Sequence, residues 1–179
     1  SERVEGPDGK MGLRLEISAK LKSLNPFKKD GFEIMIILPE KRDGEKATAS
    51  FSENAAMKRF LNNYLFKLVE KEQADKIRES DKLKAALKGD TAAAAAAGLE
   101  VAADLIIVGE AVAKPFKGNL GGLVSVSAVV NARAVRADTA EVIAANPGII
   151  TRGLDITDES AAQKALVTAG ERMASEFID

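Results

Sequence analysis

The chain of 179 residues carries 26 Lys and Arg against 27 Asp and Glu, so its net charge of −1 gives no global attraction to nucleic acid or to an anionic membrane. It contains no Cys and no His, which excludes thiol nucleophiles, disulfides, Ser-His-Asp catalysis and metal sites built from thiolate or imidazole ligands. Apolar residues make up 46% of the chain but aromatic residues only 4%, so the predicted core is aliphatic.

The first thirty residues predict one strand preceded by a linker. Residues 1–11 are polar and carry Gly and Pro, and we expect a linker or the remnant of a tag there. Apolar and polar residues then alternate with a period of two from Leu13 to Leu21, which predicts a half-buried strand. Its polar face is rich in Lys, a residue typical of exposed sheet edges. We therefore expect residues 12–31 to form an edge strand of the main sheet and the connection that follows it.

Three short apolar runs predict the central strands of an α/β sheet. They cover Glu33–Leu38, Leu65–Val69 and Asp104–Val108. Short runs of this kind are typical of parallel strands that are buried on both faces. We expect a single α/β domain over residues 12–179, with a mixed sheet in which βα units are followed by a β-meander hairpin and a C-terminal helix.

The segments between and after these runs have helical periodicity. Ser50 and Glu53 fit a capping box, in which each side chain accepts a hydrogen bond from the other residue's backbone amide. The spacing of apolar residues predicts one amphipathic helix over Gln73–Lys88. Thr91 is predicted to cap the next helix, which is rich in alanine and therefore has high helix propensity. A final amphipathic helix is predicted from about Asp158 to Ile178.

A long hairpin is predicted between the third apolar run and the last helix. The third strand continues to Ala113, and the Gly-rich residues 117–122 are predicted to form a hairpin loop rather than a phosphate-binding motif. Val124–Ala134 alternates with a period of two, and a turn at Ala137–Ala140 leads into a second arm, Glu141–Ala145. The face that carries Ser, Asn and Arg is predicted to be exposed to solvent.

Glu40 and Glu110 are the candidate ligand-binding residues. Glu40 follows the first buried strand and Glu110 lies late in the third. If the three strands lie in the order 2-1-3, both carboxylates come to the carboxyl ends of neighbouring parallel strands, where open α/β sheets bind ligands. Such a pair could raise one pKa or hold Mg²⁺ or Ca²⁺. The alternative is that Glu40 opens a surface loop and Glu110 pairs with a nearby Lys or Arg. Because the spacing alone is not specific, no catalytic residue, cofactor or metal site is predicted.

The order of the elements and three sequence motifs resemble those of one family. The motifs are EIMIILPEK, ADLIIVGEAVA and the hairpin VVNARAVRADTAEVIA. The pattern is similar to that of bacterial envelope domains of the CsgG and TolB N-terminal type, among them the LpoB-like domains and the middle domain of FlgT. The resemblance covers roughly residues 32–179. The chain departs from the pattern at Ala140, where Gly is usual, and it lacks the two long amphipathic hairpins with which CsgG builds a pore.

The resemblance implies a non-enzymatic protein that acts through protein–protein contacts. Domains of this type dock to partners, so we expect an assembly or scaffolding module that binds other envelope proteins or a second copy of itself, and no nucleic acid. The expected location is the periplasm or the periplasmic face of the outer membrane, with a leader or membrane tether upstream of Ser1. The alternatives are a small-molecule or nucleotide-binding domain with its site near Glu40 and Glu110, and a hydrolase that uses these carboxylates with a metal.

Overall fold

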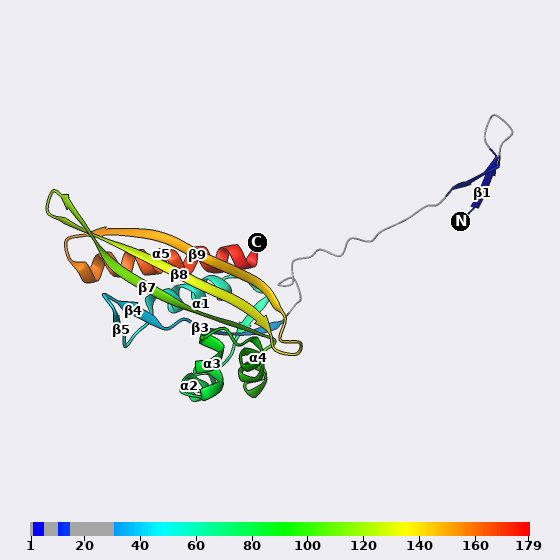
Figure 1. The fold of residues 1–179 in the computed structure, drawn as a ribbon, viewed down its shortest axis with the longest axis horizontal. Helices are drawn as coiled ribbons and strands as arrows, with labels where there is room; N and C mark the ends of the chain where they lie inside the picture. The colour runs from blue at the N-terminus through cyan, green and yellow to red at the C-terminus, as the bar shows by residue number, and fades with distance from the viewer. Residues whose placement is uncertain (1, 6–10, 15–30) are drawn as a thin grey trace.

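A computed structural model describes the backbone of residues 2–5, 11–14 and 31–179, and the side chains of residues 31–116 and 121–179. In this part of the chain the main body is a seven-stranded mixed sheet, with helices packed on both of its faces (Figure 1). The predicted fold class, a mixed sheet of βα units followed by a meander and a C-terminal helix, is confirmed.

The described N-terminal segments pair with each other. Strand β1 (Glu2–Glu5) lies within the predicted linker and pairs antiparallel with β2 (Met11–Arg14) in a separate two-stranded sheet. The start of the predicted edge strand, Leu13, is therefore paired with Arg3 and not with the main sheet. The rest of the predicted strand falls in residues 15–30, which lie outside the described residues, so it stays a prediction.

The three predicted central strands form the parallel part of the sheet. They are β3 (Phe32–Ile37), β6 (Phe66–Leu68) and β7 (Leu105–Leu120), and β3 lies between the other two. Ile36 of β3 is directly opposite Ile107 of β7. The order 2-1-3 that the sequence predicted is thus correct, and it places the ends of β3 and β7 side by side.

Strands β4 (Glu40–Arg42) and β5 (Glu45–Lys46) lie beyond the end of β3 on the same side of β7, and a long meander lies on the other side of β7. Strand β4 continues the line of β3 in parallel to β7, and β5 closes this edge in the antiparallel direction. On the other side β7 pairs antiparallel with β8 (Leu123–Arg136), and β8 pairs antiparallel with β9 (Val142–Asp155). The predicted second arm ended at Ala145, which was wrong, because β9 bends at a register shift near Pro147 and continues to Asp155.

The helices form two layers. On one face, α1 (Phe51–Leu61) packs against α5 (Asp158–Ile178), whose predicted bounds are confirmed. On the other face lie α2 (Lys71–Arg78), α3 (Asp81–Leu87) and α4 (Thr91–Glu100).

Two predictions about the second helical layer were wrong. The single helix predicted over residues 73–88 is interrupted at Ser80, whose hydroxyl accepts a hydrogen bond from the Leu83 amide at 3.1 Å and caps α3. A Ser followed by Asp81 is a typical helix start, but it is equally compatible with a continuous polar helix face. The cap of α4 is Asp90 rather than Thr91, and its carboxylate accepts from the Ala93 amide at 2.9 Å.

The core consists of two apolar layers separated by the sheet. Successive residues of a strand point to opposite faces, so Ile36 of β3 packs toward α1 and α5, whereas its neighbour Met35 packs toward the α2–α4 layer. Ile36, Ile107 and Val130 are each at most 1% exposed, which confirms that they are buried in one sheet. The layer beneath α2–α4 is aliphatic, as the composition predicted, whereas the layer beneath α1 and α5 also contains four buried Phe residues, Phe32, Phe60, Phe66 and Phe177.

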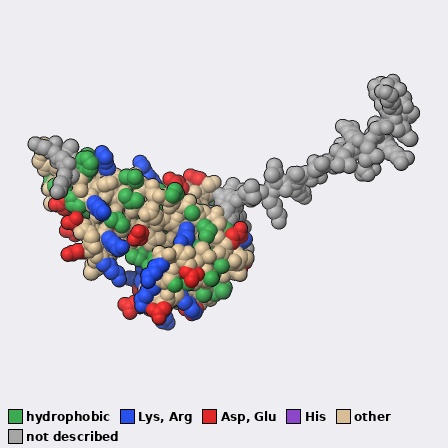
Figure 2. Space-filling model, in the orientation of Figure 1, with side chains coloured by type: hydrophobic (Ala, Val, Ile, Leu, Met, Phe, Trp, Pro, Cys, Tyr) green, Lys and Arg blue, Asp and Glu red, His purple; other side chains and the backbone are tan. Residues whose placement is uncertain are grey.

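The outer half of the meander has a helix on one face only. Helix α5 packs along β8 and β9 on that face, whereas α3 and α4 reach the opposite face only near the start of β7 and the end of β8. Among the described residues, no element covers the rest of that opposite face. Figure 2 shows green apolar and blue Lys or Arg side chains along this part of the molecule, next to its grey tip.

The end of α4 offers a test of backbone strain. Ala102 has φ +55°, and the helix ends in a pair of hydrogen bonds from Ala103 N–H to Gly98 C=O (3.0 Å) and from Ala102 N–H to Leu99 C=O (3.2 Å). This is a Schellman arrangement, in which Gly is the usual residue at the left-handed position. Because Ala102 is exposed, Ala102→Gly is expected to raise the free energy of unfolding by about 0.5–1 kcal/mol.

Urea denaturation followed by circular dichroism measures this difference. Ala92→Gly is the matched control, since Ala92 is an exposed residue inside α4, and the same substitution there should lower stability by about 0.5–1 kcal/mol. Equal signs for the two variants would contradict the strain at Ala102.

Candidate functional site

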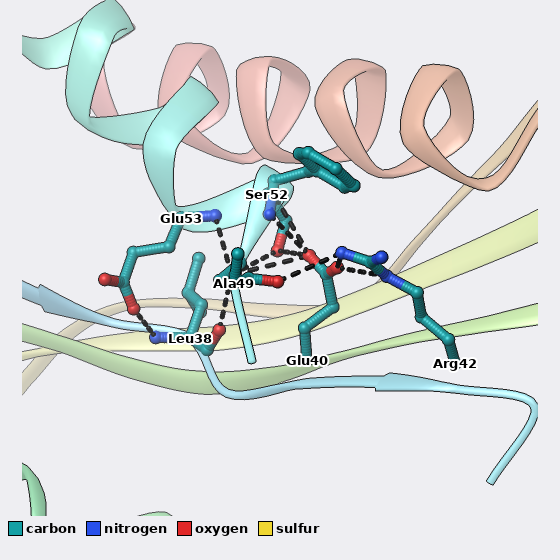
Figure 3. Close-up of polar contacts among 8 residues, drawn as sticks. Leu38, Glu40, Arg42, Ala49, Ser52 and Glu53 are labelled. Atoms are coloured by element: carbon teal, nitrogen blue, oxygen red, sulfur yellow. Dashed lines mark hydrogen bonds and ion pairs between the residues drawn. The ribbon is translucent and has the colours of Figure 1, made fainter. Parts of the chain in front are cut away.

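Glu40 is a buried carboxylate of β4 that binds the start of α1, so the alternative interpretation of Glu40 as a surface-loop residue was wrong. Its side chain is inaccessible in β4, and the whole residue is 2% exposed. One carboxylate oxygen accepts from the backbone amides of Phe51 (2.8 Å) and Ser52 (3.2 Å) and from the Ser52 hydroxyl (3.2 Å). The other accepts from the Arg42 guanidinium at 2.8 and 2.9 Å (Figure 3). Glu40 is therefore fully occupied by bonds within the protein.

This arrangement fills the place where an open α/β sheet would bind an anion. The N-terminus of a helix has free amides and a partial positive charge, which together attract phosphate or carboxylate groups. In α1 the amides of Phe51 and Ser52 already bind the Glu40 carboxylate. The Ser50 hydroxyl accepts from the Glu53 amide at 3.2 Å and donates to the Leu38 carbonyl at 2.8 Å, which fixes the turn before the helix.

The predicted capping box at the start of α1 is half correct. Ser50 caps the helix, but the Glu53 carboxylate does not return to Ser50. It accepts from the Leu38 amide at 2.7 Å and forms an ion pair with Arg78 of α2. Burial alone would lower the pKa of the Arg78 guanidinium, but the hydrogen bond and charge of Glu53, helped by Asp75, raise it above its ordinary value. Arg78 therefore stays charged and holds α2 to the end of β3.

Glu110 lies on the opposite face of the sheet from Glu40. Glu40 is directly opposite Ala111 in the parallel register of β4 and β7, and neighbouring residues of a strand point to opposite faces. The Glu110 side chain is 49% exposed and pairs with Lys41 at 3.4 Å, as the alternative interpretation of the sequence expected. The structure thus brings the two strand ends together but does not bring the two carboxylates into one site.

A cleft of about 890 Å³ lies next to the buried carboxylates. It is bounded by the end of β3, the loop before α1, and helices α2 and α3. Its volume suits a small ligand, but the carboxylates of Glu40 and Glu53, at its base, are bonded to the protein itself. Among the residues whose side chains are described, no group of three or more Asp or Glu side chains is placed to hold a metal ion. The cleft is therefore large enough for a small ligand, but the carboxylates of Glu40 and Glu53 are not free to bind one.

Replacing each glutamate by glutamine tests these two assignments. Glu40→Gln is expected to lower the free energy of unfolding by about 1–3 kcal/mol, because the amide nitrogen turns a buried acceptor into a donor that faces other donors. Glu110→Gln is the matched control, since its pair with Lys41 is exposed, and it should change stability by no more than about 0.5 kcal/mol. Chemical denaturation at neutral pH measures both. A neutral Glu40→Gln variant would show that the buried bonds contribute little.

The uncovered side of the meander is the second candidate site, and we call it the outer hairpin face. Its side chains come from β7, β8 and β9 and lie in three rows across the strands. The rows are Val112–Val129–Ile150, Lys114–Ser127–Arg152 and Phe116–Ser125–Leu154. The face is thus striped, with a cationic row between two rows that carry apolar residues.

Large apolar side chains on this face are exposed. Ile150 is 64% exposed, Leu154 50% and Phe116 46%. The Arg152 guanidinium lies over the Phe116 ring, 4.7 Å from its centroid, a favourable cation–π geometry. Sequence reasoning predicted a wet hairpin face but missed this surface, because it did not extend β9 beyond Ala145. The alternation of Ile150, Arg152 and Leu154 was the available signal.

Asp155 ties the end of β9 to α5. Its carboxylate pairs with Lys164 at 2.9 Å and accepts from the Ile156 amide at 2.7 Å. The Lys164 hydrogen bond first, then the Ile156 amide and the Lys164 charge, lower the pKa of Asp155 below its usual value despite a small opposing effect of burial. The folded state therefore favours the ionised carboxylate.

The pH dependence of stability tests this pair. A group whose pKa is lower in the folded state stabilises the fold above its unfolded pKa, here 3.8, and loses that effect as the pH falls through the folded value. Asp155→Asn should therefore be less stable than the parent at pH 6, and the difference should shrink as the pH falls below about 4. Urea unfolding of both chains between pH 6 and pH 3 measures it. A difference that grows toward low pH would contradict the assignment.

Within the described part of the chain, none of the helices combines the length and apolar character that crossing a bilayer requires. No family model matches the sequence, and no curated protein matches it.

Several solved structures of bacterial proteins are similar to the chain at low identity. The NMR structure of E. coli LpoB is 17% identical, with a TM-score of 0.44 over 69% of this chain and 58% of LpoB. The LpoB C-terminal domain from Salmonella enterica is 15% identical, with a TM-score of 0.37 over 72% of this chain and 85% of that domain. The lipoprotein GNA1162 from Neisseria meningitidis is 12% identical, with a TM-score of 0.46 over 81% of this chain and 99% of the lipoprotein.

The match to LpoB agrees with only part of the resemblance predicted from the sequence. LpoB is one of the proteins that the sequence pattern resembles, whereas the resemblance to CsgG and TolB stays a prediction. The match spans little more than half the length of E. coli LpoB.

Proposed function

We propose that this chain is a non-enzymatic interaction module of the bacterial cell envelope. It acts by docking to other envelope proteins or to a second copy of itself, in the periplasm or at the periplasmic face of the outer membrane. The observation that carries the proposal is the outer hairpin face, a sheet surface that no described element covers and that exposes Phe116, Ile150 and Leu154.

The physical reason is that a sheet normally buries both of its faces or exposes one polar face. The α5 side of the meander is buried in the ordinary way. The opposite side exposes rows of apolar side chains beside cations, and contiguous exposed apolar surface is typical of interaction sites. A partner that covers Ile150 and Leu154 would remove this apolar surface from water.

The envelope location rests on the sequence. The motifs ADLIIVGEAVA and VVNARAVRADTAEVIA resemble those of bacterial envelope domains, and they form the first part of β7, the second part of β8 and the start of β9. The rival hypothesis of a ligand site near Glu40 and Glu110 has less support, because the two carboxylates lie on opposite faces and Glu40 is bonded within the protein.

Photo-crosslinking in intact cells tests the docking proposal. A photoreactive amino acid at Ile150 or at Leu154 is expected to give protein adducts of defined mass, because both side chains would lie inside the interface. The control is the same amino acid at Lys88, an exposed residue at the end of α3. Cell fractionation of the same samples reports the compartment.

Two results would overturn the proposal. Equal adduct patterns at Ile150, Leu154 and Lys88 would show that the outer hairpin face is ordinary surface. Recovery of the protein from the cytoplasmic fraction alone would remove the envelope location.

A further inference from the structure

The outer edge of β9 is an open template for another strand. In the described residues β9 pairs with β8 alone. Its register with β8 is continuous from Ile149 to Asp155, and the stretch contains no proline. Pro147 has no N–H to donate, but it precedes this stretch, so it blocks strand addition only on the N-terminal side of Ile149. The segment 149–155 is therefore a short free edge, on which alternate residues have backbone groups that point away from β8.

Two carbonyls of this edge segment have side-chain partners. The Thr151 carbonyl accepts from the Ser127 hydroxyl, and the Leu154 carbonyl from the Lys164 ammonium, both at 3.4 Å. Ser127 belongs to β8, so its bond lies on the paired side of β9. The Lys164 bond is long and exposed, so it does not replace the strand pairing that an edge can make.

An added strand would extend the three rows of the outer hairpin face by one residue each. Residues directly opposite each other on neighbouring strands share a face and contact each other. The residues of the added strand on this face would therefore lie beside Ile150, Arg152 and Leu154, and they are spaced two positions apart. The order of the three rows therefore determines which types of residue the partner needs at these three positions.

The charge of the outer hairpin face determines which type of residue suits the middle position of the added strand, opposite Arg152. Arg152 and Lys114 lie in the same row, and no carboxylate belongs to the outer hairpin face as described. The carboxylate closest in register, Glu110, is paired with Lys41. An acidic side chain opposite Arg152 would meet a cation directly, whereas a basic one would meet like charge.

We infer that the free edge of β9 binds an extended segment of a partner protein in which an acidic residue is followed and preceded, two positions away, by apolar residues. This inference rests on the proposed function, and it names the partner's chemistry. Backbone hydrogen bonds along Ile149–Asp155 supply the affinity, and the apolar–acidic–apolar spacing supplies the specificity.

A designed peptide tests the inference directly. The probe is a fluorescent seven-residue peptide in which Val, Asp and Val alternate with Thr, and the control peptide has Lys in place of Asp. With the full chain, fluorescence anisotropy should show binding of the Asp peptide at least tenfold tighter than of the Lys peptide. Arg152→Glu should reverse this preference, and Lys88→Glu, the same charge change at the end of α3, should leave it unchanged.

Methylation of the peptide backbone separates strand pairing from general surface binding. Two further Asp peptides are N-methylated, one on its Val and Asp residues and the other on its Thr residues. Each pattern removes the backbone donors along one edge of the extended peptide. Only one of these two should lose binding. If Arg152→Glu unfolds the chain in a thermal melt, Arg152→Gln replaces it and should bring the two peptides to within about twofold of each other.

Three results would overturn the inference. The first is equal binding of the Asp and Lys peptides, and the second is binding that is indifferent to both methylation patterns. The third is that the chain binds phosphatidylglycerol vesicles and does not distinguish the Asp peptide from the Lys peptide. That result would make the face a lipid contact. If adducts still form at Ile150 in cells, the docking function survives these failures. If they do not, the docking function itself fails.

Discussion

Ile107→Asp is expected to abolish cooperative folding. Ile107 is fully buried in β7, opposite Ile36 of β3 on one side and Ala134 of β8 on the other. A carboxylate there has no partner in the apolar layer beneath α1 and α5. The cost of burying it unpaired is several kcal/mol, which is comparable to the whole stability of a domain, on the order of 5–15 kcal/mol.

Urea titration followed by far-ultraviolet circular dichroism measures this loss. Ile150→Asp is the matched control, because the same substitution is made in a neighbouring part of the sheet at a position that is 64% exposed. We expect it to cost no more than about 1 kcal/mol. A cooperative transition for Ile107→Asp with a midpoint close to the parent's would show that this segment is not a central strand.

Gly170→Ala is expected to give the second-largest loss. Gly170 lies in α5 where the helix crosses the start of α1, and an added Cβ would lie 2.1 Å from the Ser52 carbonyl oxygen. The obstacle is backbone, so α5 must move away from the turn that also binds Glu40. Overpacking of this kind costs typically 1–3 kcal/mol or more, against a gain in helix propensity of about 1 kcal/mol. Because the contact is with backbone atoms, we take the upper end of that range, about 3 kcal/mol, and expect a net loss of about 2 kcal/mol.

Gly98→Ala in α4 is the control for Gly170→Ala. Its added Cβ would meet only side-chain atoms, the nearest being the Ala137 methyl carbon at 3.1 Å. This contact needs a shift of only a few tenths of an ångström, so the gain in helix propensity should offset most of its cost. Thermal melts of the two variants compare them. Equal stability of Gly170→Ala and the parent would show that α5 does not press on the start of α1.

The candidate site was only partly predictable, and Glu40 shows why. The order of the three parallel strands follows from chain connectivity and was predicted correctly. The face on which each carboxylate lies depends on the register of β4 against β7, where a shift by one residue exchanges the faces. Apart from the nearby Arg42, the donors that surround Glu40 come from Phe51 and Ser52, which follow it only after β5 and a loop. No local pattern encodes that contact.

Elements with a local signal could be predicted from the amino-acid pattern alone. The apolar runs of β3, β6 and β7, the bounds of α5 and the burial of Ile107 all follow from periodicity over a few residues. The break at Ser80 was missed because a Ser in a polar helix face and a Ser that caps a new helix have the same local pattern. The length of β9 was missed because Pro147 interrupts the alternation, although the sheet continues past it.

Which surfaces remain free depends on how distant elements pack against the sheet. Alternation predicts that a strand has two faces, but not whether another element covers either of them. Helices α2–α4 end near the start of β7, whereas α5 runs along the meander, so one side of the outer hairpin is buried and the other exposes Ile150 and Leu154. That difference depends on helix lengths and on packing between segments far apart in the chain. Packing of this kind places the start of α1 over the Glu40 carboxylate, whereas no described element covers the outer edge of β9.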